Sequence, residues 1–217
     1  MMRTTRREML GASLGIAVTT AIRSQPAAGP VIRLPEPQTS GGMPLMDALM
    51  QRKSTRAFDT RRLSEQVLAN LLWAAWGINR PDGKRTAPSA MNRQEIDVYV
   101  VQEEGAYLYD AKENLLTRVA EGDLRAQAGS QDFVKTAPLN LVYVADLSKA
   151  GGNSDEDKIL YYATATGCIV QNVYLFCASH GLVTVVRAFV DKALLGPSLG
   201  LRADQRIVLA QTVGYPV

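Results

Sequence analysis

The 217-residue chain has little of the residues on which many enzymes depend, since it contains one histidine and two cysteines. A structural zinc site of the usual kind takes four Cys or His ligands, so the composition predicts no metal centre. One histidine also leaves little room for a histidine-dependent hydrolase. The two cysteines, Cys168 and Cys177, are nine residues apart on one predicted helix. That spacing separates them by about 13 Å along the helix axis, which excludes a disulfide between them.

The chain also lacks a net charge once its N-terminus is set aside. The formal charge is +3, but four of the 24 Lys and Arg residues and one of the 21 Asp and Glu residues lie in residues 1–28. The remainder is therefore neutral. There is no global electrostatic reason to expect nucleic acid or an anionic membrane as a partner.

No stable membrane insertion is expected from the uncharged run at residues 9–22, because its 14 residues fall short of the roughly 20 that span a bilayer. Arg3, Arg6 and Arg7 precede this run, and residues 5–10 (Thr-Arg-Arg-Glu-Met-Leu) resemble a twin-arginine export signal. We expect residues 1–28 to be a signal peptide read by the twin-arginine machinery, and the protein to be periplasmic or otherwise exported. The alternative is an ordinary amphipathic first helix.

The remaining chain divides into a Pro/Gly-rich arm, residues 29–43, and one domain, residues 44–217. Hydrophobic periodicity and helix caps predict helices over residues 45–51, 64–76, 156–180 and 191–199. Strands are predicted at 96–101, 139–145, 183–190 and 207–213, and a hairpin joins 107–110 to 115–119. The elements do not alternate strictly, so the predicted class is α+β. Apolar spacing of three and four along 156–180 indicates a core or subunit-interface helix.

Three polar segments indicate binding chemistry. If residues 52–56 are extended, Arg52, Ser54 and Arg56 point to one side and suit a phosphate with its adjoining polyol. The turn at residues 88–94 offers Asn92 and Gln94, whose amides can read the edge of an amide-bearing ring. Residues 181–189 leave a helix through a glycine turn, and a flat apolar ring can lie along them with a backbone N–H near a ring nitrogen. Taken alone, the first segment is more often a solvated basic turn and the second a polar loop.

Together these segments resemble the nitroreductase-like FMN oxidoreductases, with most similarity to the subgroup that oxidises thiazoline and oxazoline rings. The similar stretches are residues 52–56 (Arg-Lys-Ser-Thr-Arg), 71–79, 85–90, Gly167 with 171–175, and 214–216 (Gly-Tyr-Pro). The resemblance implies an α+β fold with a mixed sheet flanked by helices. It also implies a homodimer with FMN at the subunit interface.

The resemblance further implies which residues hold the cofactor. Arg52, Lys53, Ser54 and Arg56 are expected to hold the FMN phosphate, ribityl chain and pyrimidine edge. Pro88, Ser89, Ala90 and Asn92 are expected to contact the flavin from the partner subunit, and Val186, Arg187 and Ala188 to line the ring near N5. Two departures concern the phosphate and substrate sides: no basic residue follows the last strand before Val217, and Arg93 and Glu95 flank Gln94.

The implied activity is that of an exported FMN-dependent oxidoreductase. Hydride would pass through flavin N5 between an unknown donor and a small organic acceptor, as in nitro or quinone reduction. Alternatives are a dehydrogenase or oxidase of a small-molecule or peptide heterocycle, and a non-catalytic flavin-binding module. NAD(P)H is an uncertain donor, because export separates the protein from the cytoplasmic pool.

No side chain is expected to act as acid or base, since the cofactor supplies the chemistry. His180 is expected to be a helix C-terminal cation or cap, with proton donation as the alternative. Arg187 either attracts an anionic substrate or is an ordinary surface charge. Trp73 and Trp76 are expected in the core.

Overall fold

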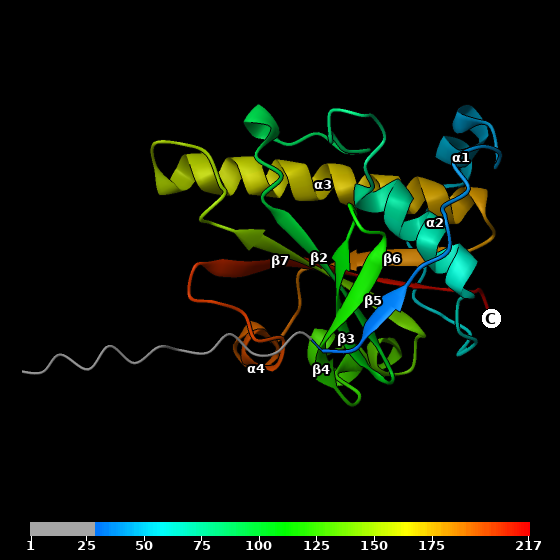
Figure 1. The fold of residues 1–217 in the computed structure, drawn as a ribbon. Helices are drawn as coiled ribbons and strands as arrows, with labels where there is room; N and C mark the ends of the chain where they lie inside the picture. The colour runs from blue at the N-terminus through cyan, green and yellow to red at the C-terminus, as the bar shows by residue number, and fades with distance from the viewer. Residues whose placement is uncertain (1–28) are drawn as a thin grey trace, which may run out of the picture.

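A computed structural model describes residues 29–217 (Figure 1). The predicted signal peptide, residues 1–28, lies outside the described residues. In the described part of the chain no helix has both the length and the apolar character needed to cross a membrane.

The described residues form one seven-stranded sheet in the order β1-β4-β3-β2-β5-β7-β6. All of the pairings are antiparallel, whereas the expected sheet was mixed. The class itself, α+β, is confirmed. The strands are β1 (Val31–Arg33), β2 (Ile96–Gln102), β3 (Gly105–Asp110), β4 (Leu115–Glu121), β5 (Leu139–Asp146), β6 (Val183–Arg187) and β7 (Gln205–Gly214).

Helices cover both faces of this sheet (Figure 1). The α-helices are α1 (Leu45–Gln51), α2 (Glu65–Trp76), α3 (Asp155–Ser179) and α4 (Lys192–Ser198), and the short 3₁₀ helices are η1 (Ala90–Asn92), η2 (Arg125–Ala128) and η3 (Asp132–Lys135). The long helix α3 and helix α2 pack on one face, and α4 lies on the other. Ser64 accepts a hydrogen bond from the first turn of α2, as predicted, and Ser154 caps α3 in the same way.

The continuous apolar run of β5 reflects burial on both sides of the sheet. Leu139, Leu141 and Tyr143 belong to the cluster under α2 and α3, whereas Val142 and Val144 belong to the cluster under α4. Successive side chains of a strand point to opposite faces, so a strand covered on both faces is mostly apolar, and the buried Asn140 is bonded to the Val134 carbonyl and to Arg187. All eight residues of β5 are buried.

The predicted arm, residues 29–43, contributes to the sheet rather than only connecting to it. Its residues Val31–Arg33 form β1, which pairs with β4 at one edge. The amide of Asn114 donates to the carbonyls of Leu34 and Pro35 and fixes the arm where it leaves the edge. The boundary between arm and domain therefore does not separate independent units.

Both cysteines are free thiols, as the helical spacing predicts. Cys177 is buried, and burial raises the pKa of its thiol. The thiolate, which is the reactive form of cysteine, is therefore disfavoured at this position.

Glu95, immediately before β2, is the most unusual polar residue of the core. It is 1% exposed, and neither carboxyl oxygen has a hydrogen-bond partner among the described residues. Burial raises the pKa of Glu95, because a low-dielectric environment disfavours the charged form.

Replacing Glu95 by Gln is expected to stabilise the protein at pH values above the raised pKa. A carboxyl whose pKa is higher in the folded state stabilises the fold only while protonated, and that contribution is lost as pH rises through the raised pKa. At high pH, Glu95→Gln should raise the free energy of unfolding by about 1.4 kcal/mol for each pKa unit by which the folded-state pKa of Glu95 exceeds its unfolded-state pKa. Below about pH 4 this gain should vanish. Urea denaturation across pH measures it. The exposed Glu113→Gln is the control, and equal behaviour of both variants would contradict the prediction.

Candidate functional site

The site begins where the chain leaves α1 and passes along β6. Residues 52–56 form neither helix nor strand, and the Thr55 N–H donates to the Thr184 carbonyl at 3.0 Å. Because β6 is an edge strand, its outer backbone groups need partners other than a further strand. The 52–56 segment supplies one of them.

Tyr174 of α3 joins this segment to β6. Its hydroxyl lies 2.7 Å from Ser54 Oγ and accepts the Val186 N–H at 3.0 Å. The Arg52 guanidinium carbon lies 5.1 Å from the centroid of the same ring, within the range of a cation–π contact. Arg52 and Ser54 thus meet the same side chain, in agreement with the alternation expected for an extended segment.

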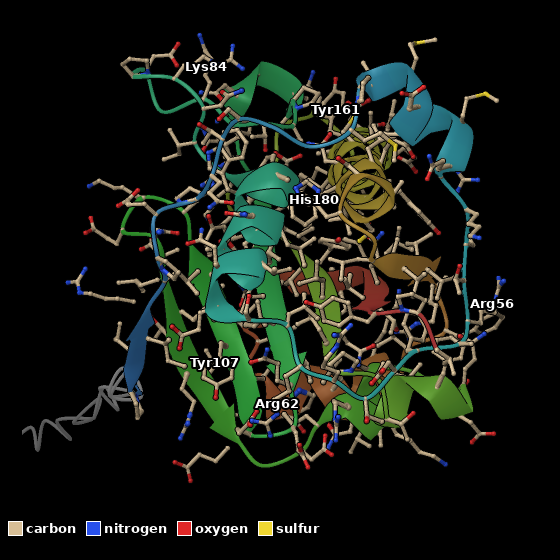
Figure 2. All side chains as sticks on the ribbon, turned by 90° about the vertical axis from the view of Figure 1, so that its right-hand side faces the viewer. Arg56, Arg62, Lys84, Tyr107, Tyr161 and His180 are labelled. Carbon is tan, nitrogen blue, oxygen red and sulfur yellow. The ribbon has the colours of Figure 1, made fainter. Side chains whose placement is uncertain are left out.

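The basic residues of the segment are available to an anion. Arg52, Lys53 and Arg56 form no ion pair with a carboxylate in the part of the chain that the structure describes. Lys53 and Thr55 line a cavity of about 440 Å³ between the end of α1, the C-terminal turns of α3 and the start of β6. Figure 2 shows Arg56 projecting outward from the same segment.

Arg187 differs from both of its predicted roles. Its side chain is 4% exposed and donates to the Ala128 carbonyl at 2.6 Å, to Asn140 Oδ1 at 2.8 Å and to Thr212 Oγ1 at 2.9 Å. Burial lowers the pKa of Arg187 to about 10, so the guanidinium remains charged at neutral pH. It is therefore neither a surface charge nor free to attract a substrate.

The backbone of residues 186–188 remains as the predicted ring contact. The Val186 N–H is already bonded to Tyr174, so it is not the free donor that the sequence suggested. Ala188 is exposed, and its N–H has no acceptor among residues 29–217. Ala188 is thus the available backbone donor at this end of β6.

The predicted loop at residues 88–94 is held in an uncommon backbone conformation. Met91, Asn92 and Gln94 have φ of 53°, 52° and 50°, in the left-handed region that non-glycine residues seldom adopt. Such strain persists only where surrounding contacts enforce it. Here Ser89 Oγ accepts the Gln94 N–H at 2.9 Å.

Gln94 is a structural residue of this loop rather than a ligand-reading one. Its Oε1 accepts from Arg85 Nε at 2.8 Å, and its Nε2 donates to the Gly83 carbonyl at 3.0 Å and to Asn92 Oδ1 at 3.1 Å. The Asn92 oxygen is therefore engaged, and the Asn92 amide presents its NH₂ group to any ligand. Pro88 and Asn92 are exposed, and Ser89 and Ala90 are half-buried.

The loop and the 52–56 segment lie near opposite ends of α3. Tyr174, near the C-terminal end, contacts Ser54, whereas Met91 lies against Gly151, four residues before the first residue of the helix. At about 1.5 Å per residue, nineteen residues of helix separate Asp155 from Tyr174 by roughly 29 Å. The tip of the loop and the 52–56 segment thus contact different parts of α3, whereas Thr86, just before the loop, lines a pocket with Asn172 in the C-terminal half of the helix.

Tyr174 and Arg85 are the residues that sequence reasoning missed. Tyr174 belongs to the similar stretch 171–175, but nothing in the sequence of that stretch indicates which partner its hydroxyl bonds. His180 follows the last residue of α3 (Figure 2). Its backbone N–H donates to the carbonyls of Phe176 and Cys177. Its ring stacks on the ring of Phe176, with the two centroids 4.0 Å apart. That geometry agrees with its expected role as a helix C-terminal residue.

No group of three or more His, Cys, Asp or Glu residues in the described chain is arranged to hold a metal ion. The site instead combines a guanidinium and hydroxyl pair beside a sheet edge, an exposed backbone donor and a strained polar turn. This combination is that of a flavin-dependent oxidoreductase, in which cations and backbone amides surround a bound nucleotide.

The chain belongs to the nitroreductase family, whose family model matches residues 49–215. It is 43% identical to a crystal structure described as a putative nitroreductase of Ralstonia eutropha JMP134, with a TM-score of 0.82, covering 86% of this chain and 90% of that one. It is 30% identical over 161 residues to a putative nitroreductase of Methanocaldococcus jannaschii, covering 69% of this chain and 81% of the relative.

A third relative, a putative nitroreductase of Desulfovibrio desulfuricans, was solved in complex with FMN. It is 21% identical with a TM-score of 0.60, covering 82% of this chain and 88% of that one. This likeness shows the shared fold. Members of the family are flavin-dependent oxidoreductases, and this chain is accordingly an enzyme of that class.

Replacing Tyr174 by Phe should weaken both the fold and flavin binding. The change removes the contacts with Ser54 and Val186 but keeps the ring under Arg52. At about 1 kcal/mol for each hydrogen bond, the free energy of unfolding should fall by about 1–2 kcal/mol, and the flavin Kd should rise several-fold. Chemical denaturation and fluorescence titration with FMN measure the two effects.

Tyr143→Phe is the matched control, because its buried hydroxyl bonds to Gln211 Oε1 at 2.7 Å and makes no hydrogen bond with residues 52–56. This control should lose stability without losing flavin affinity. Equal flavin affinity in the two variants would refute the assigned role of Tyr174.

Proposed function

We propose that the protein binds FMN between two copies of the chain and transfers hydride between a donor and a small organic acceptor. The observation that supports this most directly is the contact of Arg52 and Ser54 with Tyr174 beside the free edge of β6. Unpaired guanidinium groups and a hydroxyl suit a phosphate and its polyol, because Arg binds phosphate through paired charge-assisted hydrogen bonds.

The residues present fit FMN. In the proposed complex Arg52 and Arg56 bind the phosphate, Ser54 binds the ribityl chain or pyrimidine edge, and Lys53 adds positive charge. The Ala188 N–H donates a hydrogen bond to the flavin ring near N5. Across the interface, Pro88, Ser89 and Ala90 contact the ring of the other protomer's flavin, and Asn92 donates its NH₂ group to a ring acceptor.

When bound, FMN supplies hydride transfer at its N5 atom. The protein's own part is to bind and orient the ring and to place positive charge where the reduced ring becomes anionic. No described side chain is assigned a proton-transfer step, and the one histidine is engaged at the end of α3.

The exposed faces of α3 and α1 support the proposed homodimer. An exposed stripe of apolar and small side chains runs along α3, and α1 next to it exposes further apolar side chains. The stripe comprises Ile159, Leu160, Ala163, Thr164, Gly167 and Gln171, and the α1 residues are Leu45, Met46, Leu49 and Met50. Apolar helix faces of this kind are typical of subunit interfaces.

Flavin binding is tested by replacing both Arg52 and Arg56 with Ala. Hydrogen bonds to a charged group contribute about 2 kcal/mol each, so the FMN Kd should rise more than about tenfold. Arg33→Ala is the control, since Arg33 lies on β1 at the opposite edge of the sheet. Unchanged FMN content and affinity in the double variant would exclude the proposed phosphate site.

The interface is tested by replacing Gly167 with Arg. A Cβ at Gly167 meets no atom within 4 Å, so the protomer itself has room for a side chain. Arg should therefore leave the fold intact, convert the dimer to a monomer in analytical ultracentrifugation and release FMN. The matched control is Ala126→Arg, at an exposed site on the α4 face of the sheet. A flavin-containing dimer of Gly167→Arg would rule out this interface.

The direction of catalysis is tested with the protein as isolated. We propose reduction of a nitro or quinone acceptor, and the absorbance spectrum should show bound flavin that is bleached by a donor and restored by such an acceptor. Reduction by a thiazoline-containing peptide instead would assign the dehydrogenase activity of the subgroup that the sequence resembles. Bound flavin that neither class of compound reduces or reoxidises would indicate a binding module.

Export through the twin-arginine machinery is also proposed, supported by Arg6 and Arg7 before a short apolar run. Replacing both residues with Lys should retain the protein in the cytoplasm, as cell fractionation would measure. Export of that variant at the wild-type level would remove the assignment.

A further inference from the structure

A second hollow lies at the end of the molecule where α3 begins. It has a volume of about 650 Å³ and is lined by residues from the first turns of α3, from α4 and from the start of β7. Volumes of about 300–1,000 Å³ are typical of small-molecule sites. Its apolar lining consists of Leu147, Ile159, Tyr162, Pro197, Leu201 and Ile207.

The hollow is rimmed by cations, two of which are not neutralised. Lys158 lies 3.7 Å from Asp155, and Arg202 pairs with Asp146 and Asp204 at 3.0 Å. Lys192 and Arg206 line the same hollow and form no ion pair with a carboxylate among residues 29–217.

Arg206 is already positioned to receive an anion. One of its guanidinium nitrogens, Nη1, donates to the carbonyls of Ala203 at 2.7 Å and Gln205 at 3.1 Å. These contacts fix the guanidinium at the rim, and its remaining N–H groups stay available. A group held in place before binding loses less conformational freedom when a ligand arrives.

This hollow is separate from the proposed flavin site of the same protomer. Residues 52–56 lie beside Thr184, which pairs with Val213 near the end of β7, whereas the hollow includes Gln205 to Ile207 at its start. Six to eight steps along a strand correspond to roughly 20–27 Å. Ile159 also belongs to the proposed interface stripe, so a partner protomer would lie at the border of the hollow.

We propose that this hollow binds an organic carboxylate with an apolar body, of about the size of a medium-chain fatty acid. The carboxylate pairs with Lys192 and Arg206, and the chain lies along Ile159, Leu201 and Ile207. An apolar floor with two unpaired cations at its rim favours such a ligand. A fully polar anion would leave the apolar floor exposed to water. A neutral apolar molecule would leave the two cations without a partner. The site does not require the flavin.

The experiment is isothermal calorimetry of the purified full protein with decanoate, and with decanol as the uncharged analogue. The double variant Lys192→Gln, Arg206→Gln should bind decanoate about tenfold more weakly than the wild type, because it loses two charge-assisted contacts. Decanol should bind no more tightly than decanoate binds to that variant. The matched control is Arg33→Gln with Lys112→Gln, which removes two exposed charges elsewhere and should bind decanoate as the wild type does.

Both substituted residues of the hollow are exposed, so the fold should persist, and circular dichroism checks this. The single variants replace the double one if it unfolds. Absence of decanoate binding, equal affinity in wild type and variant, or equal affinity for decanol would each overturn the proposal. FMN content is measured in the same samples, so a defect at the flavin site is distinguished from a defect here.

Discussion

The hydroxyl of Tyr174 is the contact on which the arrangement of the site depends. It accepts the Val186 N–H and shares a hydrogen bond with Ser54, so one side chain of α3 fixes both the edge of the sheet and the segment that follows α1. An open sheet edge otherwise exposes backbone groups that invite pairing with another chain. Here the outer groups of β6 are bonded to Thr55 and Tyr174, and the same bonds hold Arg52 next to the strand.

β6 is held equally firmly from within. The Arg187 guanidinium joins β6 to Asn140 of β5, to Thr212 of β7 and to the carbonyl of Ala128 at the end of η2. A buried cation without a carboxylate partner is costly unless polar groups surround it, and three oxygen acceptors do so here. Ala188 therefore follows a strand that is anchored on both sides, and its exposed N–H occupies a well-defined position.

Local signals predicted most of the elements. Residues 45–51 were predicted as a helix and form α1, and Ser64 caps α2. The largely apolar run at 139–145 forms the buried strand β5, because a strand covered on both faces buries the side chains that point to either face. β1 was missed because a three-residue strand in a segment rich in proline and glycine is too short to show the alternation of apolar and polar residues. The antiparallel order was missed because strand pairing is set by contacts distant in sequence.

The side-chain contacts of the candidate segment were predictable only in part. Alternation along an extended segment is consistent with Arg52 and Ser54 meeting a common neighbour, but it gives no information on Arg56 and could not identify that neighbour as Tyr174. The burial of Arg187 was not predictable, because its acceptors Asn140, Thr212 and Ala128 come from segments far away in sequence. Gln94 looked like a ligand-reading amide, and only its contact with Arg85 shows that it shapes the loop.

The length of α3 has a consequence for how the proposed enzyme would assemble. An α-helix is stiff, so the roughly 29 Å between Asp155 and Tyr174 does not shorten when a ligand binds. In the proposed dimer each flavin would be bound by residues 52–56 of one protomer and by the 88–92 loop of the other. Flavin binding and dimerisation would then stabilise each other by mass action. In the proposed dimer, loss of the flavin therefore weakens the interface, and dilution of the protomers weakens flavin binding.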